Sequence, residues 1–232
     1  MALALFVGER SATARPALDL LAQQLGDARA GLVRNYHAAL VAGGVHLRLP
    51  LLEIAVPALR QTPERQLEYL LELGRRLIEI DNRVDLHEFC LYRTLRHTLG
   101  QAVAPAGRST PRASRQAVRD AAIELLAVVA DAGHSSDNAR RTRVSVPAPP
   151  IFGDWAANAT FAPPERRVEK LERCLDVLQR MNNAARRSMV EALAAAAGDD
   201  DRLNVAEAEL LRTVCATLDC PLPPLPPPAS VS

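Results

Sequence analysis

One short acidic stretch occurs twice in this chain, and the repeat decides the fold. The two copies read Asp81-Asn82-Arg83-Val84-Asp85-Leu86-His87-Glu88 and Asp200-Asp201-Arg202-Leu203-Asn204-Val205-Ala206-Glu207. They lie 119 residues apart, from position 81 to position 200. Leucines on both sides recur at the same offset: Leu52 and Leu171, Leu59 and Leu178, Leu99 and Leu218. An ungapped match at one fixed offset predicts a duplicated helical unit of about 50 residues.

Each copy has the pattern of a helix N-terminus. Asp85 precedes Glu88 by three residues, and Asn204 precedes Glu207 by three. A short polar side chain at the N-cap accepts from a backbone N–H of the first turn, and the Glu reaches back. Apolar residues then follow at helical spacing. We therefore expect a structural capping turn in each copy, formed by Asp81, Asp85 and Glu88 and by Asp200, Asn204 and Glu207.

The alternative interpretation of the octets is a loop that binds a divalent ion. A calcium-binding EF-hand needs a 12-residue loop with a central Gly and a Glu at its last position. Here the Glu stands at the eighth position, and the octets contain no Gly. The pattern favours a structural turn, so we assign no metal ligand.

Catalytic motifs were sought around the histidines and cysteines. His87-Glu88 begins like the HExxH helix of zinc peptidases, but position 91, where the second His would stand, is Leu. No Gly-rich phosphate loop, Gly-x-Ser-x-Gly motif or Cys/His nucleophile pair occurs. We predict that this chain has no catalytic residue and no cofactor.

Composition points to a helical protein. Of the 232 residues, 48% are hydrophobic but only 3% are aromatic, which suits close packing of aliphatic and Ala-rich helices. The net charge is +1, with acids and bases interspersed, so no nucleic-acid partner is expected. The first seven residues are apolar but too few to cross a bilayer, and no membrane span is expected. Of the four scattered cysteines, Cys90, Cys174 and Cys215 fall on apolar helix stripes and suggest buried free thiols. This favours a reducing, cytoplasmic compartment.

These patterns predict an all-α fold in five parts. They are an N-terminal helical pair (1–47), a first repeat unit (48–100), a loop, helix and long irregular crossing (101–164), a second repeat unit (165–220) and a Pro-rich tail (221–232). Within the N-terminal pair, Pro16 is expected to open the first helix. Leu32, Tyr36 and Leu40 are expected to form the apolar stripe of the second helix.

Several segments resemble bacterial membrane zinc metallopeptidases of the HtpX and CAAX prenyl protease kind. Residues 48–61, 81–89, 208–212 and 220–225 fit, in this order, the long region that follows the catalytic domain of those proteins. The resemblance runs from about Leu3 to Leu225. The octets also resemble the acidic turn of TerB-like tellurite-resistance domains, where a Gly usually follows the first Asp. Asn82 and Asp201 stand in that place here.

The resemblance implies a role without chemistry in this chain. The HExxH helix, third zinc ligand and transmembrane helices of the family would all lie before Met1. We expect a non-catalytic module that docks on, or regulates, a membrane-bound metallopeptidase core at the cytoplasmic face of the inner membrane. A groove between the two halves, or the crossing at 134–162, is expected to hold the partner. The alternative is a stand-alone TerB-like protein that senses an ion or ligand at the acidic turns.

Overall fold

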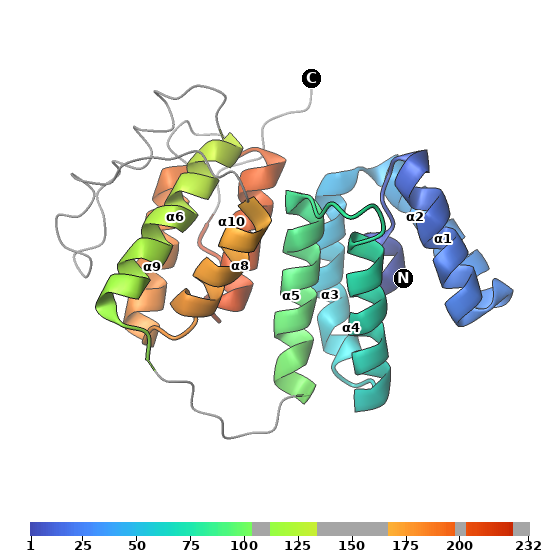
Figure 1. The fold of residues 1–232 in the computed structure, drawn as a ribbon, viewed down its shortest axis with the longest axis horizontal. Helices are drawn as coiled ribbons and strands as arrows, with labels where there is room; N and C mark the ends of the chain where they lie inside the picture. The colour runs from blue at the N-terminus through green and yellow to red at the C-terminus, as the bar shows by residue number, and fades with distance from the viewer. Residues whose placement is uncertain (104–111, 134–166, 198–202, 225–232) are drawn as a thin grey trace. The chain divides into compact units, whose positions relative to one another are not determined.

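The computed structural model describes residues 1–103, 112–133, 167–197 and 203–224. All regular structure in these ranges is helical, as the sequence predicts (Figure 1). The elements are η1 (Ala2–Phe6), α1 (Ser11–Leu25), α2 (Asp27–Gly43), η2 (Val45–Leu47), α3 (Arg48–Leu59), α4 (Glu64–Ile78), α5 (Leu86–Val103), α6 (Arg115–Gly133), α8 (Arg167–Leu178), α9 (Asn183–Ala197) and α10 (Val205–Thr217).

The chain divides into two compact units, Met1–Ala106 and Gly107–Ser232. The predicted N-terminal pair and the first repeat unit therefore share one unit, while α6 joins the helices of the second repeat unit. The proposed crossing at 134–162 and most of the Pro-rich tail lie outside the described residues.

The helix boundaries repeat at the offset of the octets. Helix α8 begins and ends 119 residues after α3, and α9 begins and ends 119 residues after α4. Helix α10 also begins 119 residues after α5, although α5 extends further at its C-terminus. The same three-helix order thus occurs once in each unit, at the spacing that the sequence repeat predicts.

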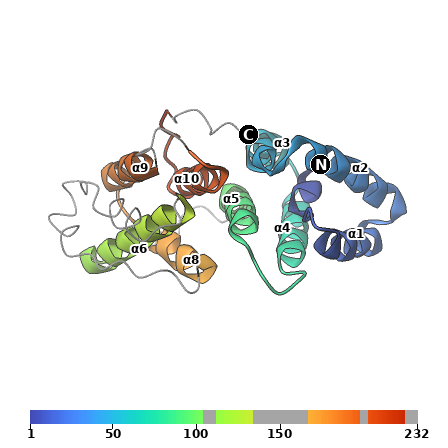
Figure 2. The same ribbon diagram turned by 90° about the horizontal axis from the view of Figure 1, so that it is seen from above.

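In the first unit, the short helix η1 lies inside the helical layer. It packs against α2, α3, α4 and α5, and its residues Ala4, Leu5 and Phe6 are buried (Figure 2). From the sequence alone, this apolar start is weighed only as a possible membrane segment. In the folded unit the same apolar residues fill the core, because removing them from water stabilises the chain by roughly 25 cal/mol per Å².

In the second unit, α6 is the helix that packs against all three helices of the repeat. It packs against α8, α9 and α10, while α10 also packs against α9. Its residues Leu125 and Val128 are fully buried. Cys174 on α8 is a buried free thiol, and burial together with the neighbouring Glu124 carboxylate raises its pKa to about 12. Cys90 and Cys215 are also buried thiols that form no disulfide, as expected from their positions on apolar stripes.

Two expectations for the N-terminal pair are wrong. Helix α1 begins at Ser11 rather than at Pro16, because the packing of Ala14 and Ala17 outweighs the one hydrogen bond that Pro16 cannot donate. In α2, Leu32 and Tyr36 are 59% and 46% exposed. The face that α2 buries against η1 and α1 instead carries smaller side chains, Ala30 and Val33, followed by Leu40. Close helix packing selects small residues there.

The helices were also compared with the length of a bilayer. Within the described ranges, no helix combines the length and the apolar character that crossing a membrane requires.

Candidate functional site

The first acidic turn folds as a capping box with a tight bend before it. The Glu88 N–H donates to Asp85 Oδ1 at 2.9 Å, and the Asp85 N–H donates to Glu88 Oε2 at 3.0 Å. Asp81 Oδ1 accepts from the Arg83 N–H at 3.0 Å. Asn82 has a φ of 58°, a left-handed conformation that Gly and Asn adopt at least cost. This explains why Asn can stand where the TerB-like pattern has Gly.

The second turn forms the same box with an additional contact. The Glu207 N–H donates to Asn204 Oδ1 at 2.9 Å, and the Asn204 N–H donates to Glu207 Oε2 at 3.1 Å. Asn204 Nδ2 also donates to the carbonyl of Ala132, at the end of α6, at 3.1 Å. Glu207 is only 2% exposed. Asp200, the first residue of this octet, lies outside the described residues.

A cavity of about 360 Å³ opens at the first turn. Its lining combines the apolar residues Leu5, Phe6 and Leu91 with side chains of both charges. The lining residues come from the N-terminal segment, α1, α3, the acidic turn and α5, so the cavity exists only when the first unit is folded. The polar and charged side chains are Glu9, Arg10, Thr13, Arg48, Asp81, Arg83, Asp85, His87 and Glu88.

Arg48 fixes one wall of this cavity. It is 2% exposed, and its Nη1 donates to the carbonyls of Leu5 and Val7 at 3.0 and 2.7 Å. Its Nη2 lies 3.6 Å from a Glu9 carboxylate oxygen. A buried guanidinium holds the N-terminal segment against α3 through these charge-assisted contacts. Arg48 is not among the candidate residues that the sequence patterns indicate. A single Arg at the start of the apolar run Leu47 to Leu52 is the signal that could have found it.

Glu88 has an unusual pKa for a surface turn. Burial, together with the nearby Asp85 and Asp81 carboxylates, raises the pKa of Glu88 to about 7 against the lowering effects of the Asp85 N–H and His87. Glu88 therefore changes its protonation state near pH 7. The cavity can change its charge in this range, so its attraction for a cation increases as the pH rises.

In the part of the chain that the structure describes, no group of three or more His, Cys, Asp or Glu side chains is arranged to hold a metal ion. Asp81, Asp85 and Glu88 come together at the cavity of the first unit, while Asn204 and Glu207 cap α10 in the second.

Comparison of the sequence with family models, with curated proteins and with solved structures found no match. The resemblance to the metallopeptidase region and to TerB-like domains thus stays a prediction from the residues quoted above.

Proposed function

We propose that this chain is a non-catalytic helical binding module, and that it docks on or regulates a membrane-bound zinc metallopeptidase. The observation that carries the binding role is the cavity at the first acidic turn. The choice of partner rests on the segments that resemble the region after the catalytic domain of such peptidases.

The cavity suits a basic side chain of the partner. Asp81, Asp85 and Glu88 each use one carboxylate oxygen for a backbone N–H, which leaves the other oxygen for a ligand. The Arg48 guanidinium is already engaged by two carbonyls and Glu9. A Lys or Arg from the partner could place its charge against these free carboxylate oxygens.

Co-purification from the native host tests this proposal. The test variant is Asp81→Asn/Asp85→Asn/Glu88→Gln, because Asn and Gln can make the same capping hydrogen bonds without the charge. The control variant Asp19→Asn/Glu64→Gln/Glu68→Gln removes three exposed carboxylates outside the cavity. We expect a zinc peptidase with the unmodified chain and the control, and its loss with the test variant.

Two results would contradict the proposal in different ways. Equal recovery of the peptidase by the test variant would remove the cavity from the docking site. Zinc-dependent proteolysis by the isolated chain would end the non-catalytic interpretation, because a zinc peptidase needs protein ligands, an open position and a general base.

Sensing of an ion or small ligand at the first turn is the second candidate. It is favoured by the pKa of Glu88, which makes the charge of the cavity adjustable near pH 7. A ligand that binds only the folded state stabilises it by an amount that grows with the ratio of ligand concentration to dissociation constant. A melting temperature that rises with millimolar calcium, and does so only while the three turn carboxylates are present, would support sensing over docking.

A further inference from the structure

A second cavity, of about 320 Å³, lies in the second unit between the start of α6 and the turn that joins α8 to α9. Its charged lining residues are Arg112, Arg115 and Arg180, and none of the described residues that line it is acidic. Its volume is at the small end of ligand pockets, which span roughly 300–1,000 Å³. The cavity is thus small, open and positively charged.

The three arginines are available to a ligand. All three are exposed, and their side chains make no hydrogen bond or ion pair to another described residue. They come from two segments that are 65 residues apart or more, at positions 112 to 115 and at 180. Three guanidinium groups around one cavity repel one another, and an anion between them relieves that repulsion. Planar guanidinium groups match the oxygens of phosphate with paired hydrogen bonds.

Two helix N-termini reach the same cavity and add backbone donors. Ser114 Oγ accepts from the Ala117 N–H at 3.1 Å at the start of α6, and Asn182 Oδ1 accepts from the Ala185 N–H at 2.8 Å at the start of α9. Each cap satisfies only the third N–H of its helix. The first two N–H groups of each helix remain for another acceptor, and the positive ends of both helix dipoles favour an anion.

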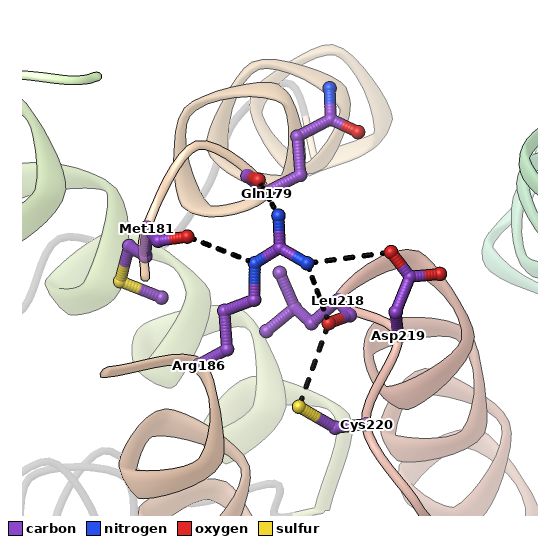
Figure 3. A network of polar contacts seen from close by, with 6 residues as sticks. All are labelled: Gln179, Met181, Arg186, Leu218, Asp219 and Cys220. Atoms are coloured by element: carbon purple, nitrogen blue, oxygen red, sulfur yellow. Dashed lines mark hydrogen bonds and ion pairs between the residues drawn. The ribbon is translucent and has the colours of Figure 1, made fainter. Parts of the chain in front are cut away.

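The turn that carries Arg180 is held in place from inside the unit. Arg186 donates to the carbonyls of Met181 and Gln179 on that turn, and also to the carbonyl of Leu218 and to Asp219 after α10 (Figure 3). Because one guanidinium ties the turn to the end of α10, the cavity wall is fixed before a ligand arrives. Such preorganisation lowers the entropy cost of binding.

We propose that this cavity binds the phosphate group of a small phosphorylated molecule, through Arg112, Arg115, Arg180 and the N-termini of α6 and α9. This site is separate from the acidic cavity of the first unit and does not depend on the proposed docking function. Its chemistry is also opposite: it takes an anion, whereas the first cavity suits a cation.

Titration of the full chain with inorganic phosphate and with glycerol 3-phosphate, against chloride at constant ionic strength, tests the proposal. The readouts are the dissociation constant from calorimetry and the amide NMR shifts of Arg115, Gln116, Asn183 and Ala184. The test variant is Arg112→Gln/Arg115→Gln/Arg180→Gln. The control is Arg15→Gln/Arg173→Gln/Arg187→Gln, which removes the same charge from exposed positions outside the cavity.

We expect the unmodified chain and the control to bind the probes, with shifts at those four amides, and the test variant to bind at least ten-fold more weakly. Tighter binding of glycerol 3-phosphate than of phosphate would show that the rest of the molecule is also recognised, whereas equal binding would assign the site to the phosphate group alone. Absence of shifts at the four amides, or equal weakening in the control, would overturn the proposal. Binding of RNA without binding of either small probe would overturn it too.

Discussion

The first acidic turn faces a cavity of about 360 Å³, whereas the second turn is covered by the end of α6. The capping hydrogen bonds are the same in both, with distances of 2.9 to 3.1 Å. The repeated three-helix order is also the same. The difference comes from the elements added to each repeat, η1 and α1 in the first unit and α6 in the second. A duplicated capping turn can thus remain a structural element in one copy and line a pocket in the other.

The largest expected effect is at a pair of equivalent positions, Leu67 in α4 and Arg186 in α9, which lie 119 residues apart. Leu67 is buried in the first core, whereas Arg186 joins two helix ends in the second unit. Arg186→Leu gives the second copy the residue of the first but leaves several carbonyls without a donor. We expect it to lower the free energy of unfolding by about 3 kcal/mol in urea denaturation.

The neighbouring Arg187 is exposed and serves as the control for this substitution. Arg187→Leu should change the free energy of unfolding by less than about 0.5 kcal/mol. If Arg186→Leu were as mild as Arg187→Leu, the junction between the α8–α9 turn and the end of α10 would not contribute to stability.

The next effect is at the second cap. Asn204→Ala removes both the N-cap of α10 and the hydrogen bond to the Ala132 carbonyl. We expect a loss of about 2 kcal/mol in the free energy of unfolding, since a cap and a buried partner are lost together. Asn204→Asp is the informative companion, because it keeps the cap but cannot donate to Ala132. It should lie between Asn204→Ala and the unmodified chain.

The first cap should matter less. Asp85→Ala removes one capping hydrogen bond at an exposed turn, and we expect a loss of about 1 kcal/mol. Chemical denaturation of Asp85→Ala and Asn204→Ala side by side measures the contribution of α6. Equal losses would mean that the contact of the second turn with α6 adds nothing to the free energy of unfolding.

The last effect is in the pH dependence of stability, and in the first copy it arises through Glu88. Its pKa is about 7 in the folded chain against an ordinary value of 4.5. Between these values the folded state binds more protons than the unfolded state, so this group makes stability fall as the pH rises from 4.5 to about 7. Glu88→Gln keeps the cap and should remove this part of the slope, measured as unfolding free energy at several pH values. An unchanged slope would contradict the assignment.

The local features of this fold could be predicted from the sequence. The packing of η1, α1 and α6 against the repeated helices could not. Periodicity and the octets predict the helix order, the repeat and the caps at Asp85 and Asn204, because the residues involved are close in sequence. The start of α1 was missed because Pro16 has the pattern of a first helical residue.

The two cavities depend on contacts between distant residues. Arg48 meets Leu5 and Val7 across more than 40 positions, and Arg180 reaches the cavity with Arg112 only after the unit folds. No local sequence pattern predicts such contacts between distant residues, because they depend on how the helices pack. The exposed placement of Leu32 and Tyr36 has the same origin, because it is the small side chains of α2 that face its neighbours.

Amide hydrogen exchange of Glu88 and Glu207, resolved by NMR, tests the difference between the two turns most directly. Each amide donates to its N-cap side chain, so the same hydrogen bond is compared in the two turns. Exchange at each is compared with that of a buried core amide in the same unit, Leu95 for the first and Val214 for the second. We predict that the Glu207 amide is protected roughly ten-fold or more relative to the Glu88 amide after this correction. Equal protection, or faster exchange at Glu207, would contradict the account of one open and one covered turn.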